Sequence, residues 1–208
     1  MTEYRSTQAD RGFSMLEVLV TILILLLGLL GLAGLQTRAH TAELESYQRA
    51  QALILASKMV DAIRGNRRTA SCFAVTNPTA GTPFAGTTGT GHIGTPACAA
   101  STASENALAN SSLTEWDQAL QGAAETLSGA SIGAMIGARG CVSYDATTEL
   151  INPATGGVIS GTGQDTVAVA WQGLNDIVAP TVNCGNGLYG SELKRRVVTM
   201  SFRLGHLL

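Results

Sequence analysis

The chain has 208 residues, of which 45% are hydrophobic, 13% charged and 5% aromatic, and its formal net charge at pH 7 is −2. The charged fraction is about half of the usual value of roughly 25%, and the basic clusters at residues 64–68 and 194–196 contain no aromatic residues. This composition argues against a nucleic-acid partner. The length fits one globular unit in addition to a membrane-length segment.

An uncharged apolar segment follows a short polar leader. Residues 1–12 mix two arginines with two acidic residues, as a weakly basic cytoplasmic leader would. From Val18 to Thr37 there is no charge, and a helix of that length spans about 30 Å, the thickness of a bilayer core. A secretory signal has a shorter apolar core and a small-residue cleavage site, and neither is present. We therefore predict a transmembrane segment over residues 16–36 that stays attached.

An amphipathic pattern continues from Ala39 to Arg64, and nothing interrupts it before Gly65-Asn66, a typical helix end. Apolar residues recur at helical spacings of three and four: Ala52, Leu55, Ala56, Met59, Val60 and Ile63. We predict one long helix over residues 13–65, with lipid or other helices around its first half and a globular domain against its second. A simple membrane anchor on a helical stalk would show the same periodicity.

The domain predicted for residues 66–208 contains a long loop over residues 76–112, where Thr, Gly, Ala and Ser dominate. Within it, residues 89–94 match the pattern G-x-G-x-x-G. No strand precedes them, and Thr95-Pro96 follows instead of a helix, so the helix N-terminus that would bind a phosphate is missing. We predict no nucleotide site there.

Regular structure is predicted again after Thr114, which we expect to cap a helix that ends near Gly129. Its apolar face would consist of Trp116, Leu120, Ala123, Ala124 and Leu127. Three later stretches alternate as strands do: residues 140–144, 165–171 and 195–204. Because loops rather than crossover helices join them, we expect an antiparallel sheet. The predicted fold class is α+β, with this sheet and one short helix packed on the long N-terminal helix.

All cysteines follow the apolar segment: Cys72, Cys98, Cys141 and Cys184. Their wide spacing, without a C-x-x-C pair, favours two disulfides in an oxidising compartment over a zinc site. Four cysteines allow three pairings, and spacing alone leaves all of them open. We favour Cys72 with Cys98 and Cys141 with Cys184, since each pair would close a loop in an irregular part of the chain.

The sequence gives little support for catalysis. His40, His92 and His206 lie on the long helix, in the predicted loop and at the C-terminus. None belongs to an H-x-x-x-H pair or has an evident Cys or Asp partner. We therefore predict no catalytic residues, no metal site and no cofactor.

The junction Gly12-Phe13-Ser14-Met15-Leu16-Glu17, with the apolar run behind it, resembles the processing site of type IV pilin-like proteins. Residues 28–36 and 56–67 resemble the PilV branch of minor pilins, also called type IV pilus modification proteins. The likeness covers about the first quarter to third of the chain. It is thinner afterwards, where it depends on the Trp-containing helix and on the strands over residues 167–171 and 195–198. Two acidic residues in the leader, and Met15 in place of the commoner Leu, depart from the pattern.

This resemblance implies that a prepilin peptidase removes residues 1–12 by cutting between Gly12 and Phe13, and that it methylates the new amino terminus of Phe13. It also implies that Glu17 contacts the positive terminus of a neighbouring subunit. An ionised carboxylate costs about 2.5–3.5 kcal/mol at the centre of a membrane helix, which is a reason for Glu17 to have such a partner. A position in the headgroup region, where the cost is small, is the alternative.

The implied function is that of a minor pilin, a structural protein that primes type IV pilus assembly together with other minor pilins. The major pilin, the inner membrane and a large tip adhesin are the further partners that the resemblance implies. It places the protein in the inner membrane, with one span and a periplasmic domain, and then in the pilus, at its tip. A minor pseudopilin of a type II secretion system and a membrane-anchored periplasmic enzyme are the alternatives.

Overall fold

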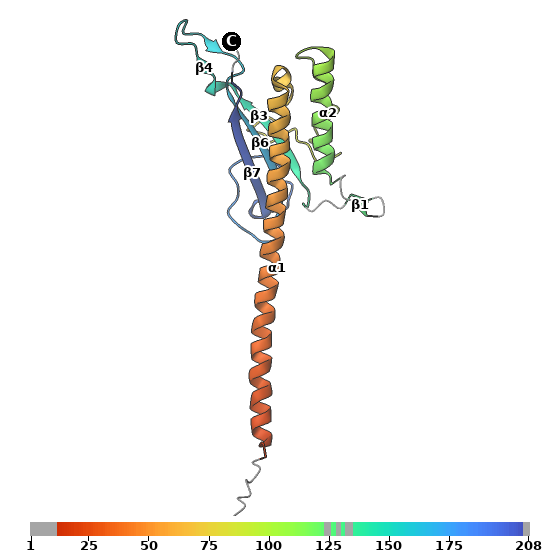
Figure 1. Ribbon diagram of the computed structural model, residues 1–208, viewed down its shortest axis with the longest axis vertical. Helices are drawn as coiled ribbons and strands as arrows, with labels where there is room; N and C mark the ends of the chain where they lie inside the picture. Colours follow the sequence, from red (N-terminus) through yellow and green to blue (C-terminus); the bar gives the residue numbers. More distant parts are fainter. Residues whose placement is uncertain (1–11, 123–125, 128–129, 132–134, 206–208) are drawn as a thin grey trace, which may run out of the picture. The chain divides into compact units, whose positions relative to one another are not determined.

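The structure, a computed structural model, describes residues 12–122, 126–127, 130–131 and 135–205. The chain divides into two compact units, Met1–Leu44 and Glu45–Leu208. In the first unit the structure describes the first part of helix α1, whereas the second unit holds the rest of α1, helix α2 and a β-sheet (Figure 1). The fold class is α+β, as the sequence predicts.

Helix α1 spans Met15–Gly65, which confirms the long helix predicted over residues 13–65 except for Phe13 and Ser14, which precede it. Ser14 caps its start, because Ser14 Oγ accepts a hydrogen bond from Glu17 N at 3.2 Å. At the other end, Asn66 Nδ2 donates to the carbonyl of Ala62 at 2.8 Å. This bond satisfies a carbonyl in the last turn, where such groups have no partner within the helix.

The sheet of the second unit has three antiparallel strands in the order β3-β6-β7. Their bounds are Arg139–Asp145 for β3, Gln164–Gln172 for β6 and Arg195–Arg203 for β7. These strands match the three predicted ones almost to the residue. In the central strand, Val167 pairs with Val142 of β3 and with Met200 of β7.

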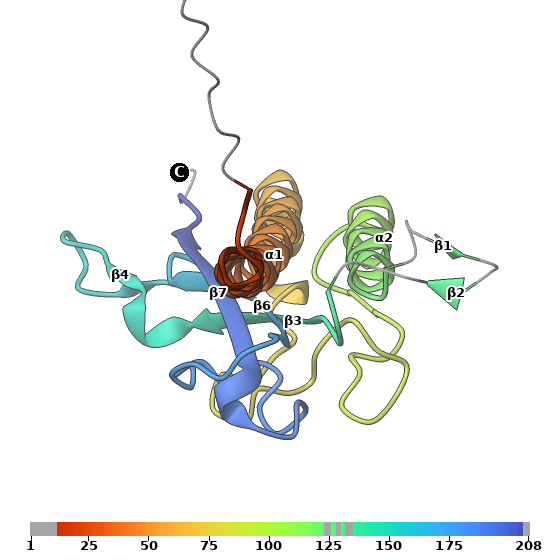
Figure 2. The same cartoon turned by 90° about the horizontal axis from the view of Figure 1, so that it is seen from below.

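One face of the sheet packs with the second part of α1 and with α2 around a single apolar core (Figure 2). The face of α1 predicted to be apolar is the buried one, apart from half-buried Leu55: Ala52, Ala56, Met59, Val60 and Ile63 are all buried. Trp116 of α2 is buried in this core and donates a hydrogen bond from Nε1 to the carbonyl of Leu55 at 2.8 Å.

Helix α2 spans Ala103–Leu120, which corrects the prediction of a loop over residues 76–112 and of a helix start at Thr114. The N-cap is Thr102: its Oγ1 accepts from Glu105 N, and Glu105 Oε2 accepts from Thr102 N, both at 3.3 Å. This capping box satisfies two backbone donors and starts the helix within the predicted loop.

The predicted apolar face of that helix is right only in its first part. Trp116 and Leu120 are buried on α2, but Leu127 lies in strand β1, Thr126–Leu127. The other predicted members and the predicted end, Ala123, Ala124 and Gly129, lie outside the described residues. Thr114 is inside the helix, where its Oγ1 donates to the carbonyl of Asn110 at 2.9 Å.

Two short hairpins and three 3-10 helices complete the described elements. Strand β1 pairs with β2, Ala130–Ser131, and β4, Leu150–Ile151, pairs with β5, Val158–Ile159. The 3-10 helices are η1, Arg67–Cys72, η2, Ala146–Thr148, and η3, Glu192–Lys194. They occupy connections between the larger elements.

Candidate functional site

The Gly12–Phe13 junction lies in non-helical backbone directly before α1. Phe13 is 83% exposed, so neither packing nor helical hydrogen bonding shields the peptide bond between the two residues. Ser14 lies between the junction and the helix, and its side chain caps the start of the helix. A protease that binds an extended segment could therefore reach this bond.

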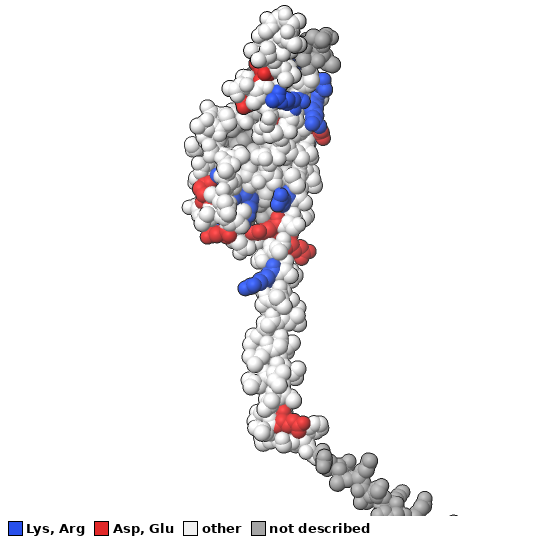
Figure 3. All heavy atoms as spheres, turned by 90° about the vertical axis from the view of Figure 1, so that its left-hand side faces the viewer, with Lys and Arg blue, Asp and Glu red and all other residues white. Residues whose placement is uncertain are grey.

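Glu17 lies in the first turn of α1, at the start of the stretch predicted to cross the membrane. This part of the helix is almost entirely uncharged in the space-filling view (Figure 3). By length and composition, α1 could cross a membrane, and its most apolar stretch is not buried within the protein. The geometry thus combines an accessible peptide bond, a carboxylate one turn further on and an apolar helix without protein cover.

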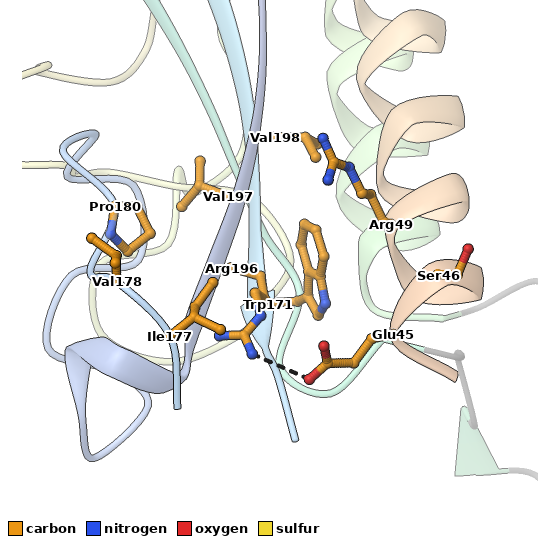
Figure 4. Close-up of a pocket in the computed structure, with 10 residues that line it drawn as sticks. All are labelled: Glu45, Ser46, Arg49, Trp171, Ile177, Val178, Pro180, Arg196, Val197 and Val198. Atoms are coloured by element: carbon orange, nitrogen blue, oxygen red, sulfur yellow. Dashed lines mark hydrogen bonds and ion pairs between the residues drawn. The ribbon is translucent and has the colours of Figure 1, made fainter. Parts of the chain in front are cut away.

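The second unit has a groove of about 550 Å³ beside β7 (Figure 4). Glu45 and Arg196 point toward each other in it, with Arg196 Nη2 3.1 Å from Glu45 Oε1. Its lining comes from α1, from the ends of the strands and from the loop between β6 and η3: Glu45, Ser46, Arg49, Trp171, Ile177, Val178, Pro180, Arg196, Val197 and Val198.

Glu45 and Arg196 of this groove hold parts of the fold together. Glu45 Oε1 also accepts from the backbone N of Leu174 and of Asn175, at 3.3 and 3.2 Å. Arg196 donates to the carbonyls of Leu193 and Asn175, at 3.1 and 2.6 Å. The pair therefore fastens α1 and β7 to the loop after β6, and its charges are already satisfied.

Arg195 holds the next part of the same loop. It is only 2% exposed, and its Nε donates to Glu192 Oε2 at 2.6 Å. The guanidinium also donates to the carbonyls of Pro180 and Cys184, both at 3.1 Å, and to the carbonyl of Val182. Two members of the basic cluster at residues 194–196 are thus occupied within the domain.

The structure contains two disulfides, Cys72–Cys98 and Cys141–Cys184, with Cα–Cα distances of 5.4 and 5.8 Å. These are the two pairs favoured from the sequence. The first joins the end of η1 to the segment before α2, and the second joins β3 to the loop after β6. Both tie irregular segments to regular elements of the second unit.

The segment that matches G-x-G-x-x-G is a turn folded around an aromatic ring. Phe84 N donates to the carbonyl of Gly91 at 2.8 Å. A Cβ on Gly91 would lie 2.9 Å from the Phe84 ring, and the φ angle of Gly91 is +83°, so both space and backbone conformation require glycine there. Gly91 therefore serves close packing against Phe84.

Asp117 of α2 binds the loop just before this turn, and His92 of the turn lies beside it. His92 Nε2 lies 3.1 Å from Asp117 Oδ1, and Asp117 also accepts from Gly86 N at 2.6 Å and from Gln121 Nε2 at 2.7 Å. His92 Nδ1 accepts from Gly94 N at 3.1 Å. Asp117 thus holds the loop through Gly86, and His92 Nδ1 holds the turn through Gly94. The sequence reasoning missed this pair, because folding brings together residues from a loop and a helix.

Within the described residues, no cluster of three or more His, Cys, Asp or Glu side chains could hold a metal ion. His40 is on the exposed surface of α1, 3.8 Å from Glu43, and His206 lies outside the part of the chain that the structure describes. The predicted site residues Gly12, Phe13 and Glu17 are close together at the start of α1, whereas the four cysteines lie in the second unit.

Comparison with protein-family models matches residues 7–33 to the prokaryotic N-terminal methylation motif. No characterised protein and no solved structure was found to match the chain significantly. The matched segment covers the Gly12–Phe13 junction, Glu17 and most of the apolar run. This motif implies processing by a prepilin peptidase and association with a membrane. Together with the long apolar N-terminal helix, it supports a type IV pilin-like protein with a structural rather than catalytic role.

Proposed function

We propose that the protein is a minor pilin of a type IV pilus, of the PilV branch, which primes pilus assembly with other minor pilins. One observation carries the pilin-like part of the proposal: an exposed, non-helical Gly12–Phe13 junction directly precedes an uncovered apolar helix with Glu17 in its first turn, inside a matched methylation motif. The PilV branch rests on the resemblance of residues 28–36 and 56–67. An apolar helix alone would also suit a membrane-anchored enzyme, but the methylation motif at its start favours a filament subunit, in which the same helix can serve first in the membrane and then in the filament.

In this proposal the peptidase cuts after Gly12 and methylates the amino group of Phe13. Methylation leaves the positive charge in place, so the terminus can pair with a carboxylate. Glu17 supplies that carboxylate to the terminus of a neighbouring subunit as the apolar helices pack together. Before assembly the apolar helix anchors the chain in the inner membrane with the second unit in the periplasm, where two disulfides fit an oxidising compartment.

After assembly the protein is in the pilus, at its tip, with other minor pilins, the major pilin and a large adhesin as partners. The processing step is tested by Gly12→Ala, whose intact mass should show an uncut leader. Gly28→Ala, inside the helix but away from the junction, is the matched control and should be cut normally. A mature mass for the Gly12 variant would overturn the assignment of the junction.

The motif fits a minor pseudopilin of a type II secretion system equally well, so the pilus role needs its own experiment. Pili are sheared from cells and separated from membranes, and the protein is detected by immunolabelling and by co-purification. We expect it in the pilus fraction with pilus subunits. Its absence from that fraction, together with recovery among secretion components, would contradict the pilus role while leaving the processing step intact.

A further inference from the structure

A small pocket of about 250 Å³ lies between η1 and one end of the sheet. Its lining is mostly apolar, and it comes from η1 and the residues after it, from β3 and β6, and from the segments beside them: Ala70, Ser71, Ala74, Tyr144, Gly161, Asp165 and Leu204. Asp165 is the only member of this lining that carries a carboxylate. The groove of Figure 4 has a different lining.

Asp165 occupies a core-facing position on the central strand. Side chains alternate along a strand, so Asp165 lies on the same face as Val167 and Val169, which are fully buried. In the sheet register it pairs with Tyr144 of β3 and with Phe202 of β7. Only 3% of Asp165 is exposed. A carboxylate thus ends a row of side chains that is otherwise apolar.

Among the described residues, no hydrogen-bond donor or cation contacts the Asp165 side chain. Tyr144 is committed elsewhere: its hydroxyl donates to Glu149 Oε1 at 2.5 Å and accepts from Gly163 N at 2.9 Å. Arg203 Nη1 donates to the carbonyl of Thr148 at 2.7 Å. Burial without a partner raises the pKa of Asp165 to about 6.

Arg64 of α1, which lies over the neighbouring strand, is also engaged. The guanidinium carbon of Arg64 lies 5.2 Å from the centre of the Phe202 ring, the cross-strand neighbour of Asp165. No ion pair joins Arg64 to Asp165 among the described residues. At neutral pH the pocket therefore contains a mostly ionised, buried carboxylate, which is costly unless a cation or donors compensate it.

We infer that this pocket receives the cationic side chain of a Lys or Arg from a partner protein, whose charged end pairs with Asp165. The walls supplied by Ala70, Ala74 and Leu204 suit the aliphatic stem of such a side chain. The volume is below the range of about 300–1,000 Å³ typical of small-molecule sites. Calcium takes six to eight oxygen ligands, and these apolar walls contribute only one carboxylate.

The first test uses the full chain in detergent micelles and two probes, n-butylammonium and n-butylguanidinium, with n-butanol as the uncharged analogue. We expect saturable NMR shifts of the Gly161 and Leu204 amides with at least one cation and not with butanol; the tighter cation distinguishes Lys from Arg. Asp165→Asn should weaken binding at least tenfold, and Asp176→Asn, an exposed acid elsewhere, should not. Equal binding by Asp165→Asn or by butanol would overturn the inference.

Two further arms sharpen the test. Binding should be roughly tenfold weaker at pH 5 than at pH 7.5, because a carboxyl group with a pKa of about 6 is then mostly protonated. A chain that ends at Gly205 should bind the probes as the full chain does. Binding ten times tighter after this truncation would show that residues 206–208 occupy the pocket, which would overturn the partner assignment.

The partner itself is tested in cells with a photo-crosslinking amino acid at Ser71, which lines the pocket. We expect a crosslink to another envelope protein at a peptide that contains Lys or Arg, and we expect it to disappear in Asp165→Asn. A crosslink of equal yield in that variant would overturn the charge-dependent contact. Because probe binding needs no pilus, failure of the pilus role would leave the first test unaffected.

Discussion

Apolar side chains of the same helix are exposed in the first unit and buried in the second. In the first unit, Leu29 and Leu30 are 61% and 70% exposed, whereas in the second Met59 and Ile63 are 1% and 0% exposed. The backbone is helical throughout α1. The comparison shows that helical hydrogen bonding is common to both parts, and that side-chain environment separates them.

This difference in exposure shows which surroundings each part of α1 requires. An exposed apolar surface larger than a few hundred Å² usually marks a membrane or protein contact, and a helix that is apolar all round needs lipid or other helices. The second part of α1 is amphipathic and obtains its apolar surroundings from its own sheet and from α2. One helix thus serves as an anchor over one part and as a core element over the other.

The largest expected effect comes from removing the carboxylate of Glu17 in the first unit. Glu17→Gln should still be cut and inserted into the membrane, because a neutral residue lowers the cost of insertion. Without the carboxylate, the amino terminus of a neighbouring subunit loses its partner, so we expect at least a tenfold loss from the sheared pilus fraction. Quantitative immunoblots of pilus and membrane fractions measure this loss.

The matched control for that variant is Glu43→Gln, which lies on the same helix but beyond the apolar run, where the carboxylate is 80% exposed. It should enter pili normally. Equal amounts of the Glu17 variant and the wild type in the pilus fraction would show that the carboxylate has no role in assembly.

The next prediction compares how a buried and an exposed apolar side chain contribute to the stability of the second unit. Trp116→Ala should lower the free energy of unfolding of the second unit by about 3–5 kcal/mol, the usual cost of removing a large buried aromatic side chain, because Trp116 is only 1% exposed. Leu29→Ala removes an exposed side chain and should leave that free energy unchanged. Urea unfolding in micelles, followed by circular dichroism, measures the free energy of unfolding of both variants. A similar loss in the two variants would contradict the difference between buried and exposed parts of the protein.

Asp165 should make the second unit less stable as the pH rises. Its pKa is raised from 3.8 to about 6 by burial, so the folded state binds more protons than the unfolded one between these values. The stability that this group contributes is therefore lost as the pH rises from about 4 to 6, by an amount on the order of 2–3 kcal/mol.

Asp165→Asn should remove this loss. The variant should be more stable than the wild type at pH 7.5 and about equally stable near pH 3.5, where the wild-type carboxyl group is also neutral. Urea midpoints measured in pairs across this range give the difference, so that other acids cancel. A constant difference at all pH values would show that the effect has another origin.

The sequence predicts most of this architecture, since periodicity is a local property. The apolar and amphipathic parts of α1, and the alternation in β3, β6 and β7, are readable from spacing alone, and the structure confirms them. The start of α2 was missed because Ala, Ser and Thr around Thr102 resemble a loop by composition. The capping box of Thr102 and Glu105 was the available signal.

The functional residues also differ in how far the sequence alone predicts them. Gly12, Phe13 and Glu17 form a contiguous motif, so the sequence brings them together without help from the fold. The pocket around Asp165 depends on pairing with Tyr144 and Phe202, which are distant in the chain. Alternation could have shown that Asp165 shares a face with Val167 and Val169, but only the register shows what surrounds it.

The smallest expected effect concerns the caps of the two helices. Thr102→Ala should lower the free energy of unfolding of the second unit by about 1 kcal/mol, because an N-cap side chain satisfies a free backbone donor. Ser14→Ala removes the corresponding cap of α1 in the first unit, and it should leave the unfolding of the second unit unchanged.

The Thr102 effect should also depend on pH. Hydrogen bonds from the hydroxyls of Ser101 and Thr102 hold the pKa of Glu105 below its usual value, so the capping contribution is present above about pH 4.5 and is lost as the pH falls through that lowered pKa. Urea midpoints measure the stability cost of Thr102→Ala at each pH, and hydrogen exchange of the Glu105 amide measures how well the cap protects the start of α2. If Thr102→Ala cost as much at pH 3 as at pH 7, the carboxylate of Glu105 would have no part in the cap, and the threonine hydroxyl alone would start α2.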